Sequence, residues 1–114
     1  VVVTRGMDCC LNIYTKEQWN TLLEQLTKLP STKADARKFV RAMGAKTAHV
    51  EIDAQGRIKL PLNLIALAHL EKECMVVGVL NYVEIWAKDK YEAMDAESNE
   101  AFETIAESLT EFML

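Results

Sequence analysis

The chain has 114 residues, half of them hydrophobic, which is normally enough for one domain with a modest core. It has no apolar run of about 18 residues, and Val1-Val2-Val3 is too short for the apolar region of a signal peptide, so we expect neither a membrane span nor a leader. Its three Cys residues lack zinc-type spacing, which predicts reduced thiols and no metal or cofactor. The sequence opens on Val in a strand-like pattern, so we expect a fragment that lacks its natural beginning.

The net charge of −4 conceals two regions of opposite sign. Residues 89–114 carry eight acidic side chains and only Lys90 as a base, a net charge of −7. Residues 28–59 carry eight basic and three acidic side chains, a net charge of +5. A basic middle is compatible with a polyanionic partner, although solvated helix faces have the same composition.

Residues 1–14 have an extended pattern interrupted by the turn residues Gly6-Met7-Asp8. Cys9 and Cys10 continue this pattern, so one is expected to face the core and the other solvent. Thr15 then begins a helix, with Gln18 three residues on as in a capping box. The apolar stripe of this helix continues until Pro30 ends it.

A second helix is predicted from a cap at Ser31 or Thr32 to Gly44. Its polar face carries four bases: Lys33, Arg37, Lys38 and Arg41. These side chains suit phosphate groups, a solvated surface or a contact between subunits, and the pattern does not separate the three.

The next segment predicts a β-hairpin with a well-defined turn. Apolar residues alternate over 48–52 and again over 58–60. Between them, Asp53 can accept hydrogen bonds from backbone amides two residues on, and Gly56 tolerates a positive φ. This chemistry is typical of a type I turn with a glycine bulge, and it leaves Arg57 at the root of the outgoing strand.

Pro61 is expected to begin a short helix, and the apolar run 74–79 is expected to form a buried strand. Leu80-Asn81 predicts a turn into a strand over 82–86. From Asp89 onward the pattern is helical and loses phase around residues 96–99, which predicts two helices or a kink. An apolar stripe in this acidic tail needs a partner, either the same domain or a neighbouring subunit: Phe102, Ile105, Leu109 and Phe112.

Two segments of the chain repeat at an offset of 72 residues: 11–19 and 83–91. Apolar, aromatic and Lys-acid positions coincide, and each segment predicts the second strand of a hairpin followed by a helix. We therefore predict one domain over 1–114 with two pseudo-symmetric parts. The first is 1–45, the remainder of a repeat half plus a linking helix, and the second is 46–114.

The motif Asp-x-x-Gly-Arg-Ile-x-Leu-Pro at Asp53–Pro61 resembles AbrB/MazE-type swapped-hairpin DNA-binding units. Further motifs, in order along nearly the whole chain, resemble the MraZ family: Val3-Thr4-Arg5-Gly6, Leu29-Pro30, Asp35-Ala36-Arg37, Ile52–Arg57, Leu70–Glu73, Val77-Gly78-Val79 and Glu84–Lys88. The sequence lacks the first of the family's two Asp-x-x-x-Arg motifs. It also has Ile65 and His69 where related hairpins often have Arg and Gly.

The resemblance implies an α+β fold, namely a small double-split (swapped-hairpin) β-barrel made of two pseudo-symmetric halves with flanking helices. It also implies a ring-like homo-oligomer. The implied function is transcription regulation by binding to double-stranded DNA, without catalysis. The resemblance also implies a location in the cytoplasm, at the nucleoid. The implied targets are repeated promoter boxes of the division and cell-wall gene cluster.

The DNA-binding residues expected on this basis are Arg57, Gln55 and Lys59, with Asp53 orienting the loop. Arg57 suits guanine or phosphate, Gln55 suits adenine, and Lys59 suits phosphate. The simpler interpretations are an Arg57 paired with Asp53 or Glu51, and a solvated Gln55.

Two other classes remain as alternatives. An antitoxin-type interaction module would use the acidic C-terminal segment to occupy a protein partner. An enzyme would have to bring His49, Asp53 and Cys74 together, and no spacing in the sequence suggests that it does.

Overall fold

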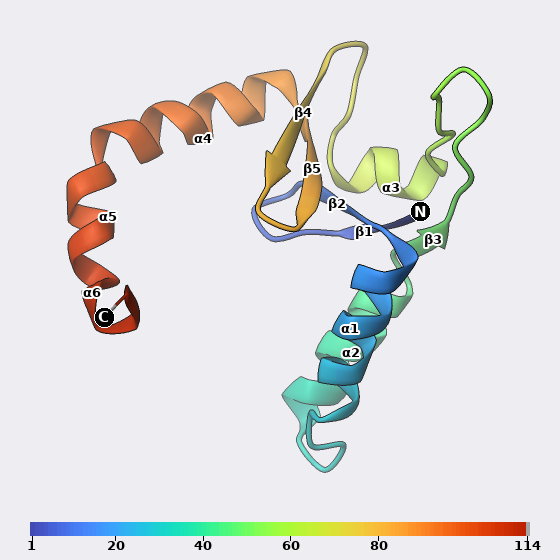
Figure 1. Cartoon of the computed structure of the whole chain (residues 1–114), viewed down its shortest axis with the longest axis horizontal. Helices are drawn as coiled ribbons and strands as arrows, with labels where there is room; N and C mark the ends of the chain where they lie inside the picture. Colours follow the sequence, from blue (N-terminus) through green and yellow to red (C-terminus); the bar gives the residue numbers. More distant parts are fainter. Residues whose placement is uncertain (114) are drawn as a thin grey trace.

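A computed structural model describes residues 1–113 (Figure 1). The elements in chain order are β1 (Val2–Arg5), β2 (Leu11–Tyr14), α1 (Lys16–Thr27), α2 (Ala34–Gly44), β3 (Thr47–His49), α3 (Leu62–Leu67), β4 (Cys74–Val79), β5 (Tyr82–Ala87), α4 (Lys88–Glu100), α5 (Phe102–Ser108) and α6 (Thr110–Met113). The strands form one antiparallel sheet in the order β3-β1-β2-β5-β4. The predicted α+β class is confirmed. Among residues 1–113, no helix combines the length and apolarity needed to span a bilayer.

The two repeated segments meet at the centre of the sheet. Strands β2 and β5 pair with Asn12 opposite Glu84, and Leu11, whose repeat equivalent is Val83, lies opposite Ile85. The repeat-related strands therefore run antiparallel about a local two-fold axis near Asn12 and Glu84. Each strand leads directly into a helix, β2 into α1 and β5 into α4.

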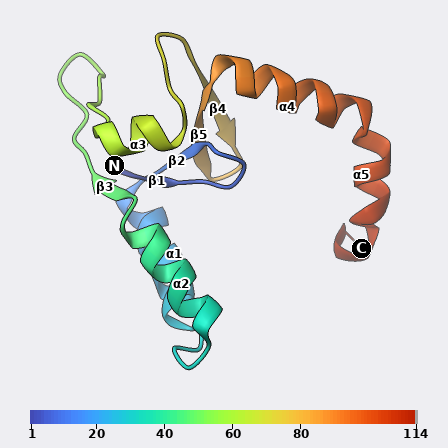
Figure 2. The ribbon, with the colours of Figure 1, turned by 180° about the vertical axis from the view of Figure 1, so that it is seen from behind.

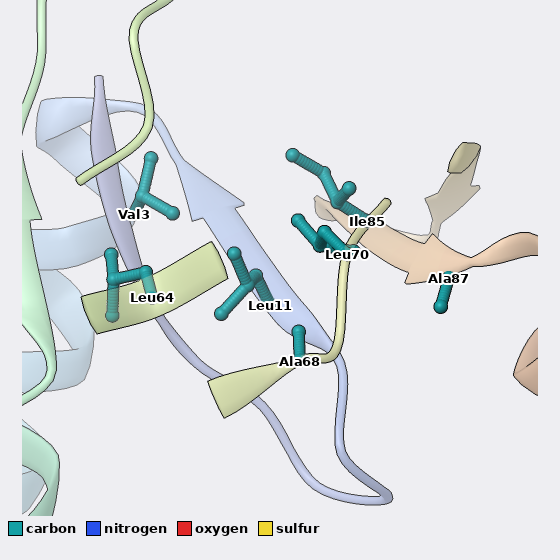
Figure 3. Close-up of a cluster of buried hydrophobic side chains, with 7 residues drawn as sticks. All are labelled: Val3, Leu11, Leu64, Ala68, Leu70, Ile85 and Ala87. Atoms are coloured by element: carbon teal, nitrogen blue, oxygen red, sulfur yellow. The ribbon is translucent and has the colours of Figure 1, made fainter. Parts of the chain in front are cut away.

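Helix α3 covers one face of the sheet and forms the core with it (Figure 3). Leu64 and Ala68 are buried against Val3, Leu11 and neighbouring side chains. Each fully buried Leu or Val side chain contributes about 1.5–3 kcal/mol to folding. This cluster is also where the chain on either side of the 53–57 loop is anchored, because the half-buried Val50, Ile58 and Leu60 pack against it.

The start of α1 is as predicted, and the start of α2 is not. Thr15 Oγ1 accepts a hydrogen bond from the Gln18 amide at 3.2 Å, and Gln18 Oε1 accepts one from the Thr15 amide at 3.1 Å. The predicted cap of α2 at Ser31 or Thr32 is wrong, because Lys33 is the N-cap and has no side-chain bond. The Lys33 amide donates to the Pro30 carbonyl at 3.0 Å, so a turn occupies this segment and the helix begins beyond reach of either hydroxyl.

Three further expectations need correction. The run 74–79 does form a strand, but β4 is an edge strand with alternating exposure, and Val76 is 68% exposed. Cys9 lies in the turn between β1 and β2 with φ of 63°, so it is not in a strand, whereas Cys10 is buried as one of the two was expected to be. The break in the C-terminal helices falls at Ala101 rather than at 96–99.

Candidate nucleic-acid interface

The loop 53–57 is closed by four hydrogen bonds that all involve Asp53. The Gly56 amide donates to the Asp53 carbonyl at 3.0 Å, and the Asp53 amide donates to the Arg57 carbonyl at 2.9 Å. Asp53 Oδ1 accepts from the amides of Gln55 and Arg57, each at 2.9 Å. Gly56 has φ of 77°, which favours glycine. The predicted type I turn with a glycine bulge is confirmed, and the Asp53 side chain holds the backbone of Arg57.

The predicted strands on either side of this turn are wrong. Only Thr47–His49 forms a strand, and it pairs with β1 rather than with residues 58–60. The Val50 amide donates to the Val1 carbonyl at 2.9 Å, which continues the contact with β1. On the outgoing side, Ile58 and Leu60 turn toward α3 and the core. Both limbs therefore place apolar side chains on the core, Val50 from the incoming limb and Ile58 and Leu60 from the outgoing one.

The side chains predicted to contact DNA lie at or beside this turn and point into solvent. Gln55, Arg57 and Lys59 are all exposed. The single ion pair among residues 1–113 joins Lys88 to Glu73, so Arg57 is paired with neither Asp53 nor Glu51. The guanidinium is therefore available, while its backbone root is held by the turn.

The loop and the basic face of α2 lie at opposite ends of the molecule. The loop projects from the upper end in Figure 1, and the α1–α2 helical pair projects from the lower end. The same separation appears in the reverse view (Figure 2). A ligand bound at Arg57 would therefore not reach Lys33, Arg37, Lys38 and Arg41 on the same copy of the chain.

The strand topology contradicts the enzyme hypothesis, which required His49, Asp53 and Cys74 to lie in one site. His49 lies in β3 and Cys74 in β4, which are the two edges of the five-stranded sheet, so these side chains do not share a site. Neither main surface cavity is lined by His49. Within residues 1–113, no cluster of three or more His, Cys, Asp or Glu side chains has the geometry to hold a metal ion.

Cys10 lies just before β2, where its side chain is buried and unsuited to thiolate chemistry. Burial raises the pKa of its thiol to about 12, and the nearby Glu84 carboxylate adds to the shift. Cys10 Sγ lies 3.6 Å from Glu84 Oε2, whose other oxygen accepts a hydrogen bond from Trp86 Nε1 at 3.1 Å. The Cys10 thiol also donates to the Met7 carbonyl at 3.0 Å, so it is held as a buried weak hydrogen-bond donor.

His69 ends α3 in a left-handed conformation that glycine adopts easily. Its φ is 53°, its amide donates to Ala66, and the next amide, of Leu70, donates to Ile65 at 3.0 Å. This is a Schellman-type helix end, with Leu70 buried in the core. The departure from Gly at position 69 therefore preserves the backbone geometry of the helix end.

A groove between α1 and α2 was missed by sequence reasoning. The sequence predicts an apolar stripe on α1 that continues to Pro30, but it does not show that the end of this stripe is exposed. Leu29 is 39% exposed and Val40, on the facing helix, is 43% exposed. Sequence periodicity identifies an apolar face but not whether the same chain covers it.

The loop 53–57 presents exposed polar side chains on a turn that is closed by four hydrogen bonds. The family model described as "MraZ protein, putative antitoxin-like" matches residues 1–42 and 43–113, and the chain belongs to this family. A relative named "Transcriptional regulator MraZ", from Ligilactobacillus salivarius (strain UCC118), is 52% identical over 113 residues. That match covers 99% of this chain and 79% of the relative.

Proposed function

We propose that this chain is a transcriptional regulator that binds double-stranded DNA in a sequence-specific manner through the loop 53–57. The observation that carries the proposal is an exposed, unpaired Arg57 whose backbone is held by two hydrogen bonds to Asp53. Membership of the MraZ family and the name of the 52% identical relative, a transcriptional regulator, support the same class.

Each loop residue has a chemically distinct role in this proposal. Arg57 can donate two parallel hydrogen bonds to guanine O6 and N7 in the major groove, and Gln55 can bond the adenine edge. Lys59 contacts phosphate, which adds affinity but carries no sequence information. Asp53 makes no direct contact with DNA, because its carboxylate would repel phosphates and Oδ1 is already bonded to two amides.

Affinity in this proposal comes from many copies of the loop acting together. Residues 51–59 contain two acids and two bases, so one loop has no net charge with which to hold DNA. A homo-oligomeric ring that presents several loops would bind repeated promoter boxes through effective concentration, without new contacts. We propose that these boxes belong to the division and cell-wall gene cluster, and that the protein acts in the cytoplasm at the nucleoid.

The proposed architecture follows from the local two-fold axis. The parts 1–45 and 46–114 would be two halves of a small swapped-hairpin barrel in one domain. The pairing of repeat-equivalent strands β2 and β5 supports this arrangement.

The test compares Arg57→Ala with Lys90→Ala, a matched removal of one exposed positive charge from α4. Binding to a fluorescent duplex with repeated promoter boxes is measured against a scrambled duplex at several salt concentrations. We expect Arg57→Ala to lower the preference for the boxes roughly tenfold or more, because each bidentate base contact contributes about 1–3 kcal/mol of discrimination. Lys90→Ala should leave the preference unchanged.

An unchanged preference in Arg57→Ala would overturn the assignment of the reading loop. Wild-type affinity that is the same for both duplexes and insensitive to salt would overturn DNA binding altogether, since phosphate contacts make affinity fall with salt.

The second candidate function is an antitoxin-type interaction module, favoured by the exposed apolar and acidic surface of α5 and α6. Phe102 and Phe112 are 68% and 75% exposed. Affinity capture from the native host with the intact chain should return a stoichiometric, unrelated protein if this function is correct. Capture of copies of the same chain alone contradicts it.

A further inference from the structure

We propose that the groove between α1 and α2 receives the acidic α5–α6 segment of a second copy of the chain. The inference rests on the homo-oligomer in the proposed function and identifies the two surfaces that would meet in it. It also gives a role to the basic face of α2, which lies away from the reading loop.

The groove has an apolar floor and a basic rim. It encloses about 310 Å³ between the end of α1 and the middle of α2. Leu26, Leu29 and Val40 are among its lining residues, and Arg37 and Arg41 stand beside them. The floor is open, because Leu29 is 39% and Val40 is 43% exposed. A segment that combines apolar side chains with acidic ones would match this surface.

The charge of the groove region is not neutralised within its own chain. Residues 28–41 contain five basic side chains and one acidic side chain, a net charge of +4. None of them takes part in the one ion pair formed within residues 1–113. Arg37 Nη1 donates to the Ser31 carbonyl at 2.9 Å, which holds its guanidinium beside the groove and leaves its other donors free.

The complementary surface lies on α5 and α6. Phe102, Ile105 and Leu109 continue along one apolar stripe, and all three are at least 44% exposed. Glu103, Glu107 and Glu111 recur at every fourth residue, and residues 102–113 contain no base. Glu103 and Glu107 lie four residues apart within α5 and so share one face of that helix, and Glu111 lies on α6, just beyond the break at Leu109.

The occupant is assigned to a second copy because the segment and the groove lie apart on one chain. In both Figure 1 and Figure 2, α4–α6 extend to one side of the sheet while α1 and α2 project from another. The side-chain hydrogen bonds of residues 102–113 are all local, such as Ser108 Oγ to the Ile105 carbonyl at 2.6 Å. The described arm is therefore held by its own helices and is directed away from its own groove.

Such a contact would be heterologous, with one surface of each kind on every copy. A heterologous contact propagates head to tail and closes into a ring when the rotation between copies allows it. Opposite charges around an apolar centre also fix the register, because a misaligned copy would place like charges together.

The experiment uses charge reversal on the full chain, with oligomer mass measured by light scattering after size exclusion and by sedimentation velocity. The first variant is R37E/R41E and the second is E107K/E111K. The third combines all four changes and restores the wild-type net charge. The matched control, K16E/K90E, shifts the net charge by the same −4 as the first variant at exposed positions outside both surfaces. Circular dichroism confirms that each variant is folded.

We expect each double reversal to weaken self-association roughly tenfold or more, since like charges brought together at an interface cost several kcal/mol. The quadruple variant should recover a large part of the loss, and K16E/K90E should assemble as the wild type does. An equimolar mixture of the two double reversals should recover assembly with the two variants alternating, because the acidic groove of one matches the basic arm of the other and the reverse contact keeps its wild-type charges.

Two outcomes overturn the inference in different ways. If the wild type assembles but the reversals change nothing, or the quadruple variant is no better than the doubles, the subunits meet elsewhere and the proposed homo-oligomer stands. If the wild type is a monomer over the whole concentration range, both the contact and the homo-oligomer are wrong. Box preference measured with Arg57→Ala tests DNA recognition separately.

Discussion

The two repeat-related units, β1–β2–α1 and β4–β5–α4, have the same local pattern and very different surroundings. The outer edge of β1 is covered by β3, with Val2 opposite His49, and Val2 and Val3 are fully buried. Within residues 1–113, β4 pairs on one side only, and Val76 is 68% exposed. An apolar strand pattern therefore determines which residues can be buried. The presence of a neighbouring strand determines whether those residues are in fact buried.

The tips of the two hairpins differ in the same way. Gly6 and Gly78 are repeat-equivalent, but a Cβ at Gly6 would lie 2.6 Å from Asn12 Oδ1 and 2.8 Å from Cys10 Sγ. A Cβ at Gly78 would meet nothing within 4 Å. One glycine allows close approach inside the fold, and the other lies on an open edge.

The largest expected loss of stability is in the central strands of the two units. Leu11→Ala should lower the free energy of unfolding by about 3 kcal/mol, because it leaves a cavity at a fully buried site. Its repeat equivalent, Val83→Ala, should cost about 1 kcal/mol, since Val83 is only half-buried and loses fewer atoms. Urea unfolding followed by circular dichroism measures both values. Equal losses would mean that the two units are buried equally in solution.

The glycine pair should show a smaller loss, with a contrast between the two units of about the same size. Gly6→Ala should destabilise the chain by about 2 kcal/mol, because Asn12 and Cys10 have to move away from the new methyl group. Gly78→Ala should be neutral or stabilising by about 0.5 kcal/mol, because the unfolded chain loses freedom and no clash is introduced. Thermal unfolding of the two single variants is the measurement. A strong loss in Gly78→Ala would indicate that a partner covers β4 in solution.

Both units should also contribute, through equivalent positions, to a loss of stability at alkaline pH. Burial raises the pKa of Cys10 from 9.0 to about 12, and burial followed by the Glu84 carboxylate raises the pKa of Tyr82 above 10.0. Both folded-state pKa values exceed the unfolded ones, so the unfolded chain loses these protons first. Stability is therefore complete below about pH 9 and is lost as the pH rises toward 12.

The matched variant for this effect is Glu84→Gln, which removes the charge and keeps an oxygen for Trp86 Nε1. It should make the decline between pH 9 and 11 less steep in urea unfolding series. A slope identical to that of the wild type would show that burial alone accounts for the shift.

Two features decided by a few neighbouring residues were predicted correctly. The Thr15–Gln18 capping box and the Asp53–Arg57 turn each depend on hydrogen bonds spanning three or four positions, as the structure confirms. The repeat at an offset of 72 was also visible in the sequence. The hydrogen bonds of the Asp53–Arg57 turn also determine where the candidate DNA-binding residues lie. Their contacts with DNA stay a prediction.

Features decided by distant partners could not be read from the sequence. Whether residues 50–52 pair with 58–60 depends on β1 and α3, which are remote in sequence. In the structure both segments contact the core, and they do not form the strands of a hairpin. The exposure of β4 and the groove between α1 and α2 depend on which surfaces the rest of the fold leaves uncovered. Hydrogen bonds within a turn act over a few residues, but apolar burial is set by whichever surface is in reach, and only the tertiary structure determines that.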